Sequence, residues 1–168
     1  MKKWKIWFLL ILIMAGSSFC FTNPVHAENE SNAGVKAAAD QFYSALNTLF
    51  TGGAGPMEEL WSHSNDVTYM GPDGGIRVGW TEVQAVWEKQ ADKKLGGKIT
   101  PDKMQIVSDP HMGITYNYET GENIDKDGKP IKVSIRATNV FRNEGGQWKM
   151  IGHHTDLLPF LEENAKDQ

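Results

Sequence analysis

The sequence predicts an α+β fold, with helices in the N-terminal half followed by an antiparallel, strongly curved sheet. Two observations carry this prediction. Apolar residues in the first half recur at helical spacing, whereas the second half holds four segments with the alternation of strands. Helices first and hairpin-linked strands later indicate α+β organisation rather than alternating α/β units.

The first 27 residues have the pattern of an export signal. Three lysines at the start precede an apolar run over residues 6–15, and Val25-His26-Ala27 offers a signal peptidase site. An uncleaved anchor is the weaker alternative, because the run is shorter than the roughly 20 residues that span a bilayer. We therefore expect an exported protein, periplasmic or secreted, with a signal peptide over 1–27, a disordered leader over 28–34, one domain over 35–161 and a flexible tail over 162–168.

The composition after cleavage excludes several kinds of chemistry. Cys20 is the only cysteine and leaves with the signal, which excludes disulfides and thiol catalysis. Loss of three lysines changes the formal net charge from −4 to −7, which argues against nucleic acid and anionic membranes as partners. Nucleotide-binding glycine loops and serine elbows are also missing from the sequence, so we expect no cofactor.

Helical periodicity defines the first half of the domain. A helix is expected from Val35 to Leu49, with a single apolar stripe that includes Phe42 and Leu46. Glycines end it, and Pro56 opens a short second helix that runs through Trp61. Strands over 66–70 and 76–78 flank a glycine turn and lead to a third helix after Gly79.

Four strands are expected in the second half, over residues 103–108, 113–122, 132–142 and 147–156. Their connections carry good turn residues: Asp109-Pro110, Asp127-Gly128 and Gly145-Gly146. Long strands with such short links imply an antiparallel, strongly curved sheet.

The last strand supplies the first candidate for a site. Trp148, Met150, His154 and Asp156 stand at even spacing, so a regular strand places all four on one face. We predict His154 as a general acid or base and Asp156 as the group that orients it. A core histidine with a satisfied partner and an exposed strand-end carboxylate are the alternatives. His153 is expected on the opposite face.

Aromatic residues supply the other candidates. Tyr69 or Tyr116 is predicted as a hydrogen-bond donor in catalysis, and the predicted ligand-binding residues are Tyr43, Trp61, Trp87, Tyr116, Tyr118 and Asn139. For each aromatic residue, plain core packing is the alternative. Asn139 is the lone polar residue on an apolar strand face, so it either lines a cavity or joins a dimer interface. His63, His111, His153 and His154 with Met70 and Met112 could bind copper, but their spacing matches no motif, and we predict no metal site.

These elements together resemble the nuclear transport factor 2-like superfamily, in particular its SnoaL-like branch, whose cone fold is ketosteroid isomerase-like. The matching features are the long first helix, the strand over 66–70 followed by Gly71, the Gly79-Trp80 helix entry and the closing hairpin with Trp148-Lys149-Met150-Ile151 and His154. The resemblance implies a cone-shaped barrel, in which the curved antiparallel sheet wraps around three N-terminal helices, with a pocket at the open end of the cone. Members of the superfamily include isomerases, cyclases, dehydratases and binding modules without a reaction.

The expected function is that of an exported small-molecule-binding protein. The resemblance and the candidate residues suit a cofactor-free isomerase, dehydratase or hydrolase that acts by acid–base catalysis on a small apolar or amphipathic ligand. A non-catalytic module that binds a hydrophobic ligand is the main alternative, and a structural dimerisation domain with a filled cavity is the third. We expect a homodimer formed through the sheet.

Overall fold

The computed structural model describes residues 24–72 and 74–156. Three helices and six strands follow one another as α1 Pro24–Leu49, α2 Gly55–Leu60, β1 Thr68–Met70, β2 Arg77–Val78, α3 Trp80–Lys93, β3 Lys98–Ser108, β4 Met112–Ile124, β5 Pro130–Glu144 and β6 Gln147–Asp156. The α+β fold class is therefore confirmed, and each of the four long strands contains its predicted segment, although β3 begins at Lys98 rather than at residue 103.

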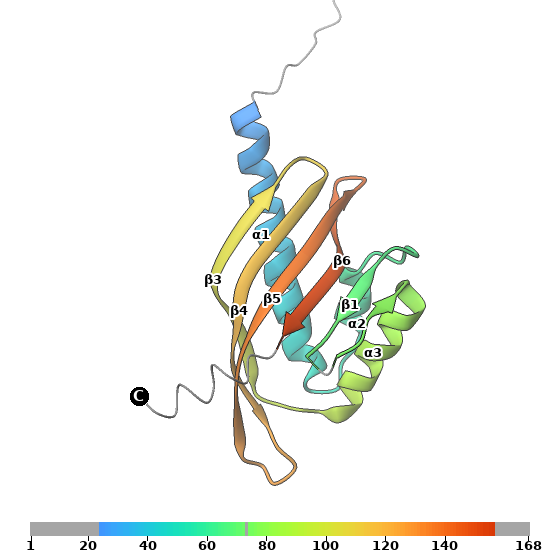
Figure 1. Cartoon of the computed structure of the whole chain (residues 1–168), viewed down its shortest axis with the longest axis vertical. Coiled ribbons are helices and arrows are strands. Elements are labelled where there is room, and N and C mark those ends of the chain that lie inside the picture. The colour runs from blue at the N-terminus through green and yellow to red at the C-terminus, as the bar shows by residue number, and fades with distance from the viewer. Residues whose placement is uncertain (1–23, 73, 157–168) are drawn as a thin grey trace, which may run out of the picture.

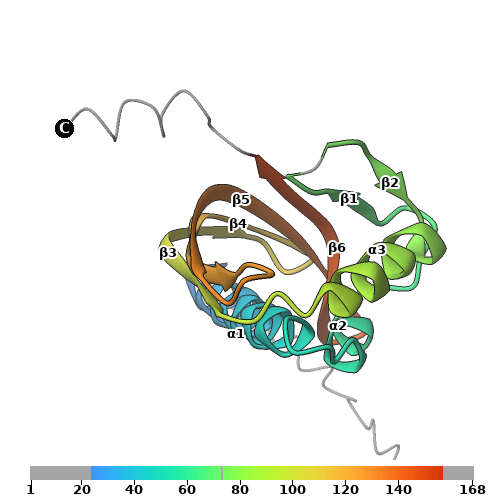
Figure 2. The ribbon, with the colours of Figure 1, turned by 90° about the horizontal axis from the view of Figure 1, so that it is seen from below.

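The sheet has the strand order β2-β1-β6-β5-β4-β3. Antiparallel pairing holds throughout except between β1 and β6, which run parallel, so the sheet is mixed rather than wholly antiparallel. It curves over α1 without closing, with α2 and α3 beside its β1 end (Figures 1 and 2). A parallel pair is possible here because β1 and β6 are far apart in sequence and are not joined by a hairpin.

The first helix lies along the inner face of the sheet and supplies much of the core. Its apolar stripe is buried as the periodicity predicted, with Val35, Phe42 and Leu49 fully inaccessible. Gly113 on β4 makes the close approach possible, because a Cβ there would lie 2.2 Å from a methyl carbon of Val35. Asn47 fixes the lower end by donating to the Ile99 carbonyl and accepting from the Ile99 amide, both at 2.8 Å.

The helix also extends further toward the N-terminus than expected. Residues 28–34, predicted as a disordered leader, belong to α1, so that prediction is wrong. Ser31 is buried, and the Oδ1 atom of Asn32 accepts a hydrogen bond from the Ser108 hydroxyl at 2.9 Å. Tertiary contacts to β3 thus hold a polar stretch in helical form. The predictions for residues 1–23 and 157–168 fall outside the described residues.

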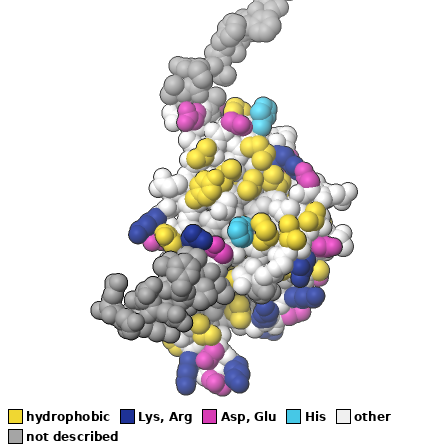
Figure 3. Space-filling view, in the orientation of Figure 1, with side chains coloured by type: hydrophobic (Ala, Val, Ile, Leu, Met, Phe, Trp, Pro, Cys, Tyr) yellow, Lys and Arg dark blue, Asp and Glu magenta, His cyan; other side chains and the backbone are white. Residues whose placement is uncertain are grey.

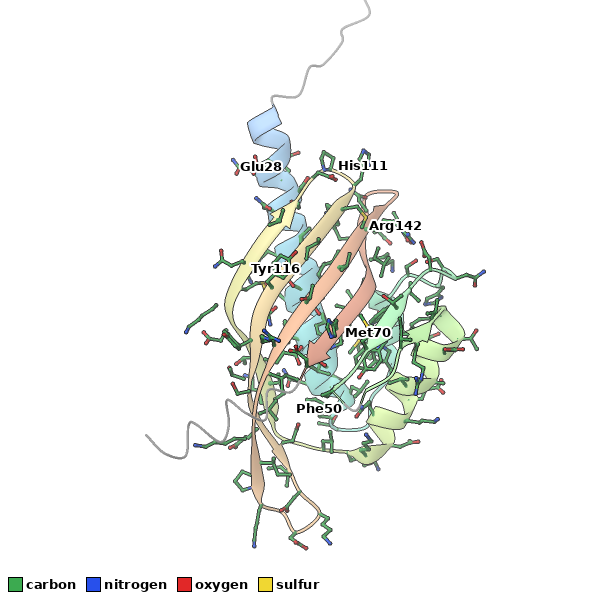
Figure 4. The ribbon with its side chains drawn as sticks, viewed as in Figure 1. Glu28, Phe50, Met70, His111, Tyr116 and Arg142 are labelled. Atoms are coloured by element: carbon green, nitrogen blue, oxygen red, sulfur yellow. The ribbon has the colours of Figure 1, made fainter. Side chains whose placement is uncertain are left out.

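A polar cluster holds the segment before β1 against β5. The Arg142 guanidinium donates to Asp66 at 2.7 Å and to Glu144 at 2.8 Å, and it also reaches the Ser64 hydroxyl at 3.0 Å. Arg142 stands at the upper end of the sheet, near the turn that carries His111 (Figure 4). The cluster fixes where β1 enters the sheet beside β6.

Candidate functional site

The curved sheet encloses a cavity of about 400 Å³ between its inner face, the lower end of α1 and α3. Most of the wall is apolar, contributed by residues that include Leu46, Phe50, Ile99 and Ile135. Phe50 stands where α1 ends (Figure 4). Volume and lining are those of a small-molecule site.

A carboxyl group and an imidazole line this cavity from two strands of the sheet. Glu119 on β4 and His153 on β6 are 4 % and 5 % exposed, and the distance from Glu119 Oε1 to His153 Nε2 is 4.0 Å. Both appear among the lining residues of the cavity. A carboxyl group and an imidazole therefore meet at a water-poor surface.

A buried hydrogen-bond network fixes the carboxyl group. Tyr43 on α1 donates from its hydroxyl to Glu119 Oε1 at 3.2 Å, and the same hydroxyl accepts from the Asn117 amide at 2.7 Å. Asn117 also donates to the Tyr118 carbonyl at 3.0 Å, an acceptor that fixes the orientation of its side-chain amide. Each of these side chains comes from an inward position on α1 or β4.

A second set of contacts fixes the imidazole. Asn139 on β5 donates to the Thr115 hydroxyl at 3.0 Å and to the Tyr43 hydroxyl at 3.4 Å, which leaves its Oδ1 atom 2.6 Å from His153 Nδ1. An amide oxygen only accepts, so Nδ1 of His153 carries the proton. In the neutral ring the Nε2 lone pair then faces the Glu119 side.

Burial sets the charge state of the pair. Desolvation raises the pKa of Glu119 from 4.5 to about 7, and the Tyr43 hydrogen bond opposes this rise only in part. Desolvation also lowers the pKa of His153 from 6.5 to about 3. Near neutral pH the imidazole is uncharged while Glu119 is poised between its two forms. This combination is suited to general acid and base catalysis.

Aromatic rings surround the imidazole. Phe42 lies 4.9 Å from His153 between ring centroids, Tyr69 5.7 Å and Trp87 5.9 Å. Tyr69 and Trp87 also line the cavity, and their rings meet edge to face at 4.9 Å. The aromatic shell excludes water from one side of His153, which accounts for the lowered pKa.

The structure contradicts the predicted orientation of His154. A β-bulge separates Phe141, paired with Met150, from Val140, paired with Gly152, so Ile151 is an extra residue on β6. The bulge shifts the alternation by one, and His153 rather than His154 follows Met150 onto the inner face. His154 is exposed, and Asp156 forms a 2.5 Å ion pair with Arg136 on the outer face.

The tyrosines of β4 also differ from expectation. Tyr116 and Tyr118 are 47 % and 41 % exposed, so they lie on the outer face and not in the wall of the inner cavity. Figure 4 shows Tyr116 on this outer face. The inward positions of this strand hold Thr115, Asn117 and Glu119 instead. Polar residues are inside here because they satisfy one another through the network with Tyr43 and Asn139.

The remaining predicted ligand-binding residues are all buried. Trp87 and the predicted catalytic residue Tyr69 line the cavity. Tyr43 and Asn139 lie behind Glu119 and His153, where they hold these two side chains in place. Trp61 packs behind Trp87, with 6.0 Å between ring centroids.

Glu119 is the functional candidate that the sequence did not reveal. Its strand alternates Thr115, Asn117 and Glu119 with Tyr116 and Tyr118, and apolar preference pointed to the tyrosines as the inner set. Gly113 was the available signal, because a glycine in a strand often marks close packing of that face against another element. Gly113 and Glu119 are an even number of residues apart, so both lie on the same, inner face.

No group of three or more metal-ligating side chains converges within 24–72 and 74–156. His63 stacks on Trp80 at 4.4 Å, far along the chain from the His153 site. Within the same described ranges, no helix is long and apolar enough to cross a membrane.

This architecture, an open curved sheet around a long helix with a pocket inside, is the nuclear transport factor 2-like cone. The family profile described as the SnoaL-like domain matches residues 35–157. The chain belongs to the SnoaL-like domain family. No curated protein matches the sequence.

Solved structures share the fold at low sequence identity. A candidate dehydratase of the NTF2-like family from Streptomyces avermitilis is 18 % identical, with a TM-score of 0.69 over 77 % of this chain and 98 % of that one. A candidate ketosteroid isomerase from Shewanella frigidimarina is 21 % identical, with a TM-score of 0.58 over 71 % and 92 %. A candidate calcium/calmodulin-dependent protein kinase type II association domain from Thiobacillus denitrificans is 24 % identical, with a TM-score of 0.63 over 73 % and 94 %. These likenesses show the fold alone.

Proposed function

We propose that this small-molecule-binding domain is a cofactor-free enzyme that transfers protons on a small, largely apolar ligand, with Glu119 and His153 as acid and base. The observation that carries the proposal is the 4.0 Å approach of the Glu119 carboxyl to a neutral imidazole on the wall of an apolar cavity. Buried titratable groups without a salt-bridge partner are costly, and they cluster at sites of chemistry.

The roles differ from those predicted from the sequence. His153 takes the role assigned to His154, and Asn139 rather than Asp156 orients the ring, because the bulge at Ile151 exchanges the two faces. Tyr69 keeps its place beside the reacting groups. General acid–base catalysis by such groups contributes about 10²–10⁴-fold to a rate.

Ligand class follows from the cavity wall. Among the described residues the wall offers mostly apolar surface around the Glu119–His153 pair, and its one lysine, Lys132, is exposed at the rim. A neutral ring or short-chain compound with one polar group suits this surface, whereas phosphates and sugars do not. Trp87 Nε1 and Thr155 Oγ1, on two lining residues, are buried without a hydrogen-bond partner among the described residues, which favours a ligand that carries a polar atom.

Proton transfer can be tested without the natural substrate. A panel of small apolar ketones is incubated with the protein in D₂O, and exchange of carbon-bound hydrogen is followed by NMR. We expect exchange with the wild type and a loss of at least about 100-fold in Glu119→Gln, which cannot carry the proton. Ser134→Ala, on the cavity rim outside the network, is the control. Equal exchange in Glu119→Gln and wild type would overturn the assignment, and binding without exchange would favour a non-catalytic ligand carrier.

The outer face of the sheet is proposed as the surface of a homodimer. Val107, Met112, Tyr116 and Tyr118 are all exposed by more than a third, and hydrophobic side chains gather on this face (Figure 3). Exposed apolar patches of this kind mark interaction sites.

Export is likewise proposed, on the basis of residues 1–27 alone. Mass spectrometry of the protein recovered from the host tests it: a chain that begins at Glu28 is expected, and an intact N-terminus would contradict cleavage.

A further inference from the structure

The gap between Glu119 and His153 is too long for a direct hydrogen bond and the right size for a bridge. Oε1 and Nε2 are 4.0 Å apart, and a polar contact over such a distance invites a water between the two atoms. An oxygen placed about 2.8 Å from both atoms would see them at an angle of about 90°. This angle is close to the one between the two protons of water.

The surrounding hydrogen bonds decide whether Glu119 Oε1 and His153 Nε2 donate or accept hydrogen bonds toward the gap. The Tyr118 carbonyl fixes the Asn117 amide, which donates to Tyr43 and leaves the Tyr43 proton for Glu119 Oε1. The Tyr43 oxygen accepts a second hydrogen bond, from the Asn139 amide nitrogen. The Asn139 side chain is thereby oriented with its oxygen toward His153 Nδ1. Both Oε1 and Nε2 are therefore acceptors toward the gap.

Resting on the proposed proton-transfer function, we propose that the gap is a water-binding subsite, and that the reaction adds water to a carbon–carbon double bond conjugated to a carbonyl or removes it again. Only a group with two protons satisfies two acceptors at this angle, and water is the smallest such group. Its oxygen lone pairs then face the cavity, where the substrate lies.

The chemistry balances on these residues. In the addition direction, the water oxygen bonds to the double-bond carbon remote from the carbonyl while one water proton passes to His153 Nε2. The carboxyl proton of Glu119 goes to the carbon next to the carbonyl. The imidazolium proton returns to the Glu119 carboxylate through the next water, which restores the neutral pair. Removal of water follows the same steps in reverse.

Among the described residues, Tyr43 donates to Glu119 and the Tyr69 ring stacks beside His153. Lys132 lines the same cavity from its exposed rim, and the neighbouring His154 helps to lower the pKa of His153. The inner positions of β5 beside Glu119 and His153 hold Ile135, Ala137 and Asn139.

Two measurements on the full chain test the subsite. A crystal structure that resolves ordered waters should show a density peak within hydrogen-bond distance of both Oε1 and Nε2. The peak should be lost in His153→Phe and kept in His154→Phe, the matched change on the opposite face. Histidine ¹⁵N NMR should show Nε2 of His153 unprotonated, which decides the matter if His153→Phe does not fold.

An empty gap, direct contact between the two side chains or a protonated Nε2 would overturn the inference. Those results would leave the proton-transfer function standing if hydrogen exchange still required Glu119. A bridging water in a protein without hydrogen exchange would instead support the subsite and overturn the function.

Discussion

At the scale of single residues, one carboxyl group determines the behaviour of the site. Glu119 is buried opposite an uncharged imidazole, and among the described residues the Tyr43 hydroxyl is the group that stabilises its negative charge. Ionisation of Glu119 is therefore disfavoured in the folded state and unhindered in the unfolded chain. This difference couples the stability of the protein to pH.

Glu119→Gln should reveal that coupling. Folding raises the pKa of Glu119 from 4.5 to about 7, so the folded protein keeps the carboxyl proton that the unfolded chain loses. The stabilisation that accompanies the protonated carboxyl is complete below pH 4.5 and is lost as pH rises to 7. We expect the free energy of unfolding of Glu119→Gln to improve relative to wild type by about 3 kcal/mol across this window. Urea denaturation at a series of pH values measures it. A difference between the two proteins that stays constant with pH would show that Glu119 titrates normally in the folded state.

His153 changes the free energy of unfolding with pH in the opposite direction from Glu119. Its pKa is lowered from 6.5 to about 3, so its contribution is complete above 6.5 and is lost as pH falls toward 3. Between about 4.5 and 6.5 the folded and unfolded states bind equal numbers of protons on this pair, and the two effects cancel. The comparison with Glu119→Gln is therefore more informative than the pH profile of the wild type alone.

At the scale of secondary-structure elements, the bulge in β6 decides which histidine reaches the cavity. Ile151 is the unpaired residue, and pairing of His153 with Asn139 resumes directly beyond it. A strand without the bulge would continue the alternation from Met150 and bring His154 inward. One residue thus separates the predicted site from the observed one.

Deletion of Ile151 tests this account of the strand. It leaves Met150 opposite Phe141 and Gly152 opposite Val140, so His153 should stay inside and uncharged from pH 5 to 8 in NMR titration. Loss of a half-buried side chain should lower the free energy of unfolding by about 1–3 kcal/mol.

Insertion of one alanine after Gly152 is the matching variant with the opposite expected result. The added residue reverses the side-chain alternation beyond Gly152, so His153 should turn to the outer face and become exposed. A normally titrating His153 in the deletion variant, or a buried one in the insertion variant, would contradict the proposed role of the bulge.

Periodicity predicted the elements well and the site poorly, for a physical reason. The stripe of α1 and the alternation within each long strand are local properties that burial enforces. Tyr43, Asn117, Glu119, Asn139 and His153 become acceptable core residues only through contacts between α1 and three different strands. A single sequence contains no local signal for such mutual satisfaction, and apolar preference favoured Tyr116 and Tyr118 instead.

At the scale of the whole molecule, the sheet separates two surfaces to which we assign different roles. Its inner face, with α1 and α3, forms the cavity, while its outer face carries exposed Tyr116 and Tyr118 beside the Arg136–Asp156 ion pair. The two faces share strands β4, β5 and β6, so assembly on one face would steady the strands that hold Glu119 and His153 on the other.

Tyr116→Asp tests the proposed assembly. A carboxylate at the centre of a dimer interface would be desolvated without a partner, so the variant should sediment as a monomer where wild type sediments as a dimer. Ile76→Asp places the same charge at an exposed apolar residue before β2, at the other end of the sheet, and should leave the dimer intact. Wild-type protein that sediments as a monomer would rule the interface out.

The most direct test of the central claim compares the two adjacent histidines in the D₂O exchange measurement. The structure turns His153 to the cavity and His154 to the outer face, and their residue type and sequence neighbourhood are otherwise matched. We predict that His153→Gln lowers hydrogen exchange at least about 100-fold, whereas His154→Gln exchanges at the wild-type rate. Loss of exchange in His154→Gln with full exchange in His153→Gln would contradict the assignment of the inner face and of the site built on it.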